Sequence, residues 1–193
     1  MIWNEHSEIP DNTHAPFSPS NYFWINYDDE RIVKYYISLM AKTKGTELHA
    51  FARDAIRLGI QLKMTKKNEN IARYVNDAIK HNMRPEQKLK YSSLFFGCAD
   101  AIEFDERNNV LRIFDLKTGV TPAKLDQLLI YDSLFCLEYG KDPFKIDHDI
   151  RIYQNNDVLA DNPTGEMIRP IMDKIVDFDR RVRDYLEGEI WTN

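Results

Sequence analysis

Three side chains in the middle of the sequence, Asp100, Asp115 and Lys117, have the types and spacing that metal-dependent hydrolysis needs. Two carboxylates that face each other repel, and placing them among apolar residues costs free energy unless something compensates. A divalent cation compensates, because carboxylate oxygens bind Mg²⁺ while water and substrate phosphate oxygens complete its coordination. A neighbouring lysine can orient the attacking water and help to deprotonate it. These residues therefore predict phosphodiester hydrolysis.

A β-hairpin would bring the three side chains together. Residues 91–104 (YSSLFFGCADAIEF) and 110–116 (VLRIFDL) are apolar and β-branched runs on either side of a polar turn, which is the pattern of two antiparallel strands. If the residues that flank a four-residue loop face each other, Asp100 lies directly opposite Asp115. Lys117 points the same way as Asp115, because side chains two apart on a strand share a face.

Helices must surround this hairpin, because apolar residues recur at helical spacing in five segments of the chain. Gly45 separates the first two helices, and Thr121-Pro122 and Gly140 supply start and stop signals for the fourth. We expect helices over residues 28–43, 47–62, 68–83, 122–139 and 166–187, and one more strand over residues 149–154. This order predicts an α/β fold, with a central mixed β-sheet flanked by helices and the site at one sheet edge.

The bulk composition indicates one globular domain. The chain has 193 residues, of which 43% are hydrophobic and 30% are charged, so it can bury a core. No run approaches the roughly 18 apolar residues of a membrane helix, and the N-terminus lacks the layout of a signal peptide. We expect a single domain over residues 1–193, no membrane partner and an intracellular location. Residues 1–27, which contain three prolines, should form an irregular N-terminal arm.

The charge is uneven along the chain. The formal net charge of -5 argues against binding of nucleic acid by bulk electrostatics. The segment from Arg57 to Lys90 nevertheless holds nine Lys or Arg against three acidic residues. This segment is either a strip that binds phosphates or simply a solvated helix face, and the sequence favours neither. The two cysteines, Cys98 and Cys136, are too few for a disulfide framework or an iron-sulfur cluster.

Four motifs occur in a fixed order over residues 45–131. They are Gly45-Thr46-Glu47-Leu48-His49, Gly97-Cys98-Ala99-Asp100-Ala101-Ile102, Asp115-Leu116-Lys117-Thr118-Gly119 and Gln127-Leu128-Leu129-Ile130-Tyr131. Together they resemble the PD-(D/E)XK nuclease superfamily, in its RecB-like and lambda-exonuclease-like branch without an iron-sulfur cluster. The ordered set is far more specific than the tripeptide D-x-K alone. The resemblance implies a restriction-endonuclease-like core.

The resemblance also implies a set of metal ligands. His49 and Asp100 would bind the metal, Asp115 would be the second carboxylate ligand, and the backbone carbonyl of Leu116 a further one. Glu86 occupies the place where many members have a helix glutamate near the metals, and it would support these ligands or bind a second metal. It could equally pair with a neighbouring lysine. The expected cofactor is Mg²⁺ or Mn²⁺, since both prefer oxygen donors.

The remaining site residues follow from the same resemblance. Lys117 would be the catalytic lysine. The alternatives are an ordinary surface lysine or a salt bridge with Asp115, and the nearby Asp100 favours catalysis. Gln127 and Tyr131, one helical turn apart, would face the site and hold the substrate or the lysine. Arg53 replaces the usual glutamate four residues after the histidine, which either weakens the ligand set or adds a phosphate contact. The expected nucleic-acid contacts are Arg53, Lys63, Lys66, Lys67 and Arg73.

The resemblance implies an enzyme that hydrolyses DNA, with an exonuclease of recombination, repair or phage replication as the preferred interpretation. The expected substrates are linear ends or single strands, the expected compartment is the bacterial or phage-infected cytoplasm, and a homo-oligomer is an option by analogy alone. Three alternatives stay open: an endonuclease, a member of the fold without catalytic activity that binds nucleic acid or a partner, and a hydrolase of small phosphoesters.

Overall fold

The computed structural model describes Phe17 and residues 19–190, with the side chains of residues 20–22 and 189–190 left aside. Backbone contacts divide the chain into two units, residues 1–46 and 47–193. In the first unit, the 3-10 helix η1 (Pro19–Asn26) is followed by the beginning of helix α1 (Asp29–Leu58). The prediction of an irregular arm is therefore wrong for residues 19–26. Residues 1–16 and 18 of the predicted arm lie outside the described part of the chain.

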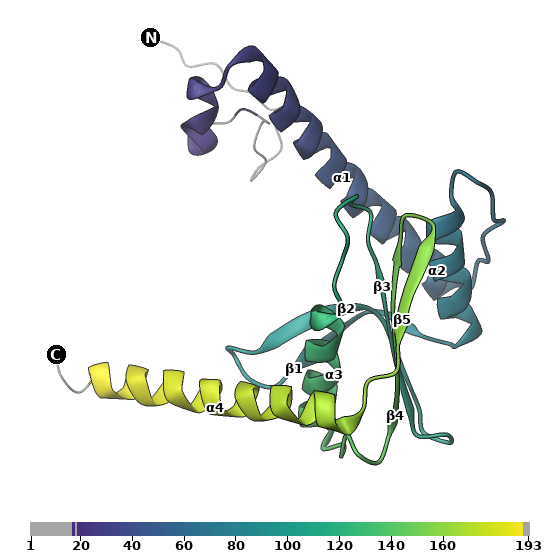
Figure 1. Cartoon of the computed structure of the whole chain (residues 1–193), viewed down its shortest axis with the longest axis vertical. Coiled ribbons are helices and arrows are strands. Elements are labelled where there is room, and N and C mark those ends of the chain that lie inside the picture. The colour runs from purple at the N-terminus through teal and green to yellow at the C-terminus, as the bar shows by residue number, and fades with distance from the viewer. Residues whose placement is uncertain (1–16, 18, 191–193) are drawn as a thin grey trace, which may run out of the picture. The chain divides into compact units, whose positions relative to one another are not determined.

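The second unit is built on one five-stranded sheet (Figure 1). The strands follow the chain order, and every neighbouring pair is antiparallel except β3 and β4, which are parallel. Helix α3 (Asp126–Tyr139) connects that parallel pair. The bounds are β1 Arg84–Lys90, β2 Phe96–Asp105, β3 Val110–Leu116, β4 Asp147–Gln154 and β5 Asp157–Asp161. The expected α/β class with a mixed sheet is confirmed.

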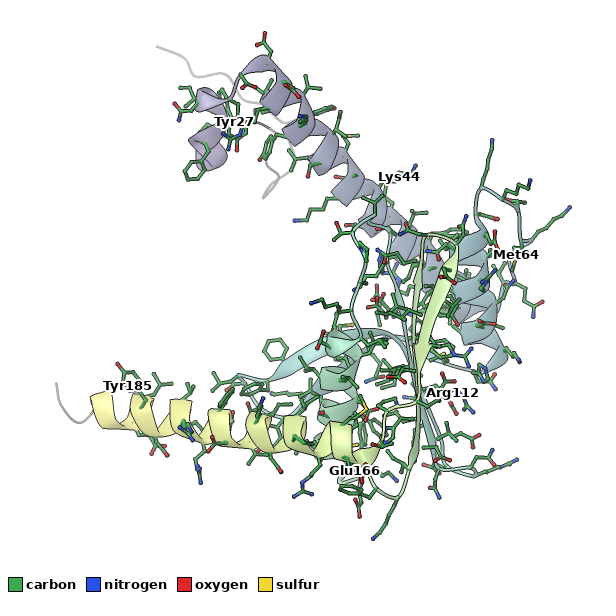
Figure 2. The ribbon with its side chains drawn as sticks, viewed as in Figure 1. Tyr27, Lys44, Met64, Arg112, Glu166 and Tyr185 are labelled. Carbon is green, nitrogen blue, oxygen red and sulfur yellow. The ribbon has the colours of Figure 1, made fainter. Side chains whose placement is uncertain are left out.

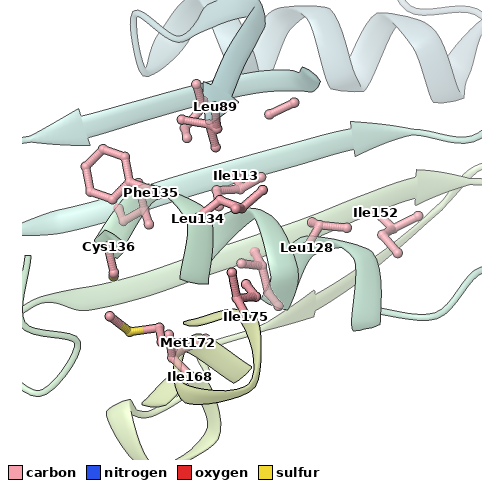
Figure 3. Close-up of a cluster of buried hydrophobic side chains, with 14 residues drawn as sticks. Leu89, Ile113, Leu128, Leu134, Phe135, Cys136, Ile152, Ile168, Met172 and Ile175 are labelled. Carbon is pink, nitrogen blue, oxygen red and sulfur yellow. The ribbon is translucent and has the colours of Figure 1, made fainter. Parts of the chain in front are cut away.

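Helices cover both faces of this sheet. Helix α3 and the beginning of helix α4 (Gly165–Ile190) pack on one face, where a cluster of buried apolar residues fills the space (Figure 3). Helix α2 (Glu69–Lys80) and the end of α1 pack on the other face around a second buried cluster. Among the described helices, none is long and apolar enough to cross a membrane.

Helix α1 corrects the prediction of a break at Gly45. It runs without interruption from Asp29 to Leu58, because a glycine inside a helix costs only about 1 kcal/mol and lacks the proline ring that would end it. The stop is Gly59, whose φ of +65° is the left-handed conformation that glycine adopts readily after a helix. His49, expected at the start of a helix, therefore lies within one.

Helix α3 begins later than predicted, at Asp126 rather than Pro122. The side chain of Gln154 explains the difference, because it satisfies backbone groups of this segment without a helix. Its Oε1 accepts from the N–H of Ala123 at 2.9 Å, and its Nε2 donates to the carbonyls of Gly119 and Thr121 at 2.6 and 2.8 Å. The predicted helix end at Gly140 is confirmed, with φ +60° there.

Two strands were not predicted. Strand β1 is rich in charged and polar residues, so no apolar pattern predicts it. Its neighbour β2 begins at Phe96 rather than at residue 91.

Strand β5 pairs with β4 through a two-residue turn, Asn155-Asn156, in which both residues have positive φ. Asparagine tolerates that conformation, and two such residues between strands are the signature of a tight hairpin. This turn could therefore have been predicted from the sequence.

Candidate active site at the end of β3

Asp115 and Lys117 lie where strand β3 ends. Asp115 is 4% exposed, and the Lys117 ammonium donates to its Oδ1 at 3.0 Å and to Oε1 of Gln127, on α3, at 2.9 Å. The second carboxylate oxygen of Asp115, Oδ2, is buried and lies 3.0 Å from the same ammonium, yet it accepts no hydrogen bond of acceptable geometry from any described residue. A buried carboxylate oxygen without a hydrogen bond is costly and needs an explanation.

Asp100 lies beside Asp115, as the hairpin register predicts. The pairs from Asp105–Val110 to Ala101–Phe114 match the expected alignment, and Asp100 and Asp115 are the next positions along the two strands. The Oδ2 atom of Asp100 accepts the backbone N–H of Leu116 at 3.0 Å and lies 3.3 Å from Nδ1 of His49. Asp100 thereby joins α1 to the end of β3.

A third carboxylate, Glu86, continues the row that Asp100 and Asp115 form across neighbouring strands. Strand β1 pairs Pro85 with Ala101 and Gln87 with Ala99, so Glu86 and Asp100 are the positions between these pairs. Glu86, Asp100 and Asp115 therefore succeed one another across β1, β2 and β3. Glu86 belongs to a strand, whereas the family members that the motifs resemble carry the corresponding glutamate on a helix.

The sheet is irregular at this row. Ala99 packs in the cluster under α3 and Ala101 in the cluster under α2, although residues two apart on a regular strand share a face. The opposite residue, Glu86, has φ +50°. The other described non-glycine residues with positive φ are all asparagines, Asn82, Asn109, Asn155 and Asn156, and each lies at a turn. Glu86 is therefore the unusual case, and such strain concentrates at functional sites.

The charged groups of the site act on one another. Burial raises the pKa of the Asp115 carboxyl, and the nearby Asp100 charge raises it further, against the attraction of Lys117 and His49. The interaction with the Asp100 carboxylate raises the pKa of His49 despite burial of the imidazole. His49, Asp100, Asp115 and Lys117 therefore lie close enough for their charges to act on one another.

Gln127 and Tyr131 extend the site on α3. The Tyr131 hydroxyl donates to the carbonyl of Cys98 at 2.7 Å and lies 3.5 Å from Nε2 of Gln127. A Cβ atom at Gly97 would approach the Tyr131 ring to 2.7 Å, which no side chain there could avoid without displacing the ring. The motif glycine and the motif tyrosine therefore fit together, and Gln127 links this contact to Lys117.

The predicted nucleic-acid contacts fall into two groups. Arg53 and Arg73 are held by acids, Arg53 by Asp54 and Glu86 and Arg73 by Glu69. The lysines of the connection between α1 and α2 are exposed, and none pairs with an acid within the described residues: Lys63, Lys66 and Lys67. Met64 marks this segment in Figure 2.

The lysine-bearing connection lies at the same end of the sheet as the site. Asn68 fixes it by accepting the N–H of Thr65 at 2.7 Å and donating to the carbonyl of Lys63 at 3.1 Å. Two residues on, the amide of Asn70 donates to the carbonyl of Tyr153 at 3.1 Å and to that of Lys117 at 3.4 Å. The basic connection is thus tied to the backbone of Lys117.

The sequence did not point to Asn70 or to Tyr74, which both reach the site from α2. Burial raises the pKa of the Tyr74 hydroxyl well above its usual range, and the charges of Asp100 and Asp115 raise it further. The Oδ1 atom of Asn70 is buried and accepts no hydrogen bond from the described residues. No local pattern marks either residue, because their partners are distant in the chain.

The donor chemistry of the site fits a divalent cation. Asp100, Asp115 and His49 supply the oxygen and nitrogen ligands that Mg²⁺ and Mn²⁺ accept, and Oδ2 of Asp115 has a lone pair that no hydrogen bond uses. The described part of the chain nevertheless contains no group of three or more His, Cys, Asp or Glu side chains already gathered around one point. Leu116 contributes its N–H to Asp100, and a role for its carbonyl stays a prediction.

No protein-family model matches this chain, and no curated protein matches it at a significant level. The resemblance of its four motifs to the PD-(D/E)XK nucleases therefore stays an expectation.

Proposed function

We propose that the protein is a divalent-metal-dependent phosphodiester hydrolase and, more narrowly, a nuclease that acts on DNA. The observation that carries the proposal is the buried Oδ2 of Asp115, which accepts no hydrogen bond although Asp100 and Lys117 lie beside it. The ion pair with Lys117 offsets only part of the cost of burying this carboxylate, because burial and the Asp100 charge together raise its pKa, and functional sites are where such costs persist. A cation bound by that oxygen would remove the cost.

The residues of the chain divide the chemistry among them. His49, Asp100 and Asp115 would hold the cation, which when bound polarises a phosphate and lowers the pKa of a water molecule. Lys117 is fixed between Asp115 and Gln127, where its ammonium can orient the attacking water and offset the negative charge that develops on the phosphate. Tyr131 keeps the beginning of β2 in place through its hydrogen bond to the carbonyl of Cys98.

The choice of DNA rests on the exposed lysines and on the motif resemblance. Lys63, Lys66 and Lys67 are exposed next to the segment that contacts the backbone of Lys117, so phosphates bound there would lead into the site. This binding is local, since the chain as a whole carries a net charge of -5. Exonucleolytic action on linear ends or single strands is proposed from the resemblance alone.

A second candidate function also has an observation in its favour. Each carboxylate of the row has a basic partner within the protein: Arg53 for Glu86, His49 for Asp100 and Lys117 for Asp115. A site neutralised in this way would suit a member of the fold that binds nucleic acid or a partner protein without cleaving it. The buried Oδ2 atom of Asp115, which accepts no hydrogen bond, favours the enzyme over this alternative.

Labelled linear and circular DNA, incubated with Mg²⁺ or Mn²⁺, tests the proposal. Lys117→Ala should lower the rate of cleavage about 10²–10⁴-fold while DNA binding is retained, because the lysine acts on the water. Lys145→Ala, at an exposed lysine that pairs with Asp142, is the matched control and should cleave like the wild type. Cleavage of linear but not circular DNA would favour the exonuclease over the endonuclease. If the wild type cleaves neither DNA nor RNA with any divalent metal, the enzyme proposal is wrong.

A further inference from the structure

The ion pair between Arg53 and Glu86 lies at one end of the carboxylate row. Arg53 is one helical turn after His49 on α1, and its Nη1 lies 3.4 Å from Oε2 of Glu86. Its Nε and Nη2 donate to the Asp54 carboxylate at 2.8 and 3.2 Å, so two acids fix the guanidinium. Arginine stays protonated at any physiological pH and therefore keeps its positive charge here.

The position of Glu86 is maintained at a cost. Its φ of +50° lies inside a strand, and a left-handed conformation is sterically unfavourable for a residue with a side chain. A partly exposed ion pair contributes little to stability, so the pair with Arg53 does not offset that cost by itself. A third carboxylate held beside the site at the expense of stability indicates a role in the site.

The row offers two intervals in which a cation could bind, one between Glu86 and Asp100 and one between Asp100 and Asp115. Neighbouring strands lie about 4.8 Å apart, which is near the separation of about 3.5–4 Å between the metals of two-metal sites. The oxygen that accepts no hydrogen bond, Oδ2 of Asp115, belongs to the second interval. The first interval has Arg53 beside it, and Oδ2 of Asp100 is already engaged by the N–H of Leu116.

We propose that Arg53 holds Glu86 out of the metal centre, so that the wild-type site binds one divalent cation between Asp100 and Asp115, and the guanidinium takes the place of a second. This inference rests on the proposed function. A doubly charged cation in the first interval would be repelled by the guanidinium and would find Glu86 already paired. With Asp54 included, four carboxylates against the permanent charges of Arg53 and Lys117 leave two formal negative charges, which one divalent cation balances.

Counting bound Mn²⁺ by electron paramagnetic resonance, with no DNA present, tests this inference apart from activity. The wild type should bind one Mn²⁺ per chain. Arg53→Gln should bind two, because Glu86 becomes available and the repulsion is removed. Arg53→Lys, which keeps the charge, should bind one. The double variant Arg53→Gln/Glu86→Gln should also return to one, and circular dichroism of each variant confirms that it is folded.

Each result has a defined consequence. Two Mn²⁺ in the wild type, or one in folded Arg53→Gln, overturns the inference and leaves the proposed hydrolase intact. Glu86→Gln alone should keep one Mn²⁺, and a loss of binding would show that Glu86 is a ligand of the first cation, which also overturns the inference. A wild type that binds no Mn²⁺ at millimolar concentration overturns the proposed metal dependence, and the inference with it.

Discussion

The protein contains two histidine–aspartate pairs that differ in how completely they are enclosed. His148 and Asp132 are 2% and 0% exposed in their side chains, and His148 Nδ1 lies 2.7 Å from Asp132 Oδ2. His49 and Asp100 are 33% and 25% exposed, and their contact is 3.3 Å. The same two residue types thus form one closed pair and one open pair in a single fold.

The closed pair has its hydrogen-bonding capacity filled. Nε2 of His148 lies 3.1 Å from the carbonyl of Pro143, and the second oxygen of Asp132 accepts a weak hydrogen bond from the Cys136 thiol at 3.6 Å. Asn162 donates to the carbonyl of His148 at 2.7 Å. The pair therefore joins α3 to β4 and to the loops beside them, which is a structural role.

The open pair lies next to a buried group that does not make all of its possible hydrogen bonds. Asp115, next to Asp100, keeps a buried oxygen without a hydrogen bond, and Glu86, on the other side, is in a strained conformation. Residue type therefore does not distinguish a structural pair from a functional one. What separates them is whether the surrounding atoms satisfy every donor and acceptor.

Removal of each histidine should give the largest contrast. His148→Gln should lower the free energy of unfolding by about 3–5 kcal/mol, because Asp132 would stay buried without its charged partner. His49→Gln, in the open pair, should change it by less than about 1 kcal/mol, since partly exposed ion pairs contribute little. Urea denaturation of both variants measures the difference. Equal losses would show that the two pairs do not differ as proposed.

The stability of the closed pair should depend on pH. Burial lowers the pKa of His148, but the hydrogen bond and charge of Asp132 outweigh it, aided by the Pro143 carbonyl and Asp147, so the pKa is above its ordinary value. Burial raises the pKa of Asp132 by more than His148 lowers it. Because both pKa values are raised, the pair keeps one shared proton in the folded state. The pair should release it at higher pH than an unfolded histidine does.

Because the pKa is raised in the folded state, the protonated pair stabilises the fold at low pH. Its contribution to the free energy of unfolding is complete below the pKa of an unfolded histidine, about 6.5, and is lost as the pH rises through the folded pKa. The loss is about 1.4 kcal/mol for each pH unit between the unfolded and the folded pKa. The double variant His148→Gln/Asp132→Asn lacks the titrating pair. The difference in unfolding free energy between it and the wild type should shrink above pH 6.5. A difference that stays constant or grows would contradict the prediction.

The sequence predicted what local patterns encode. A short apolar and β-branched run indicated β3, and the length of the polar turn predicted the register that puts Asp100 beside Asp115. The end of α3 at Gly140 followed from the conformational freedom of glycine. These features depend on residues within one element or one turn, where spacing determines geometry.

Features that depend on distant contacts were not predicted. Strand β1 is polar and acquires its place by pairing with β2, so no apolar pattern marks it. Asn70 reaches Lys117 across 47 positions, and the pairing of Arg53 with Glu86 crosses 33. The buried pair of His148 and Asp132 joins residues 16 positions apart, and no local pattern marks it either.

The smallest expected effect tests whether Glu86 is strained. Glu86→Gly should raise the free energy of unfolding by about 0.5–1 kcal/mol, because glycine adopts φ +50° without a steric cost and this outweighs the backbone entropy lost on folding. Gln87→Gly, one position along the same strand, should lower it by a similar amount, since Gln87 has no positive φ to relieve. Thermal unfolding of the two variants distinguishes the cases. If both glycines destabilise equally, the backbone at Glu86 stores no strain, and the open region loses one of the two features that set it apart from the closed pair.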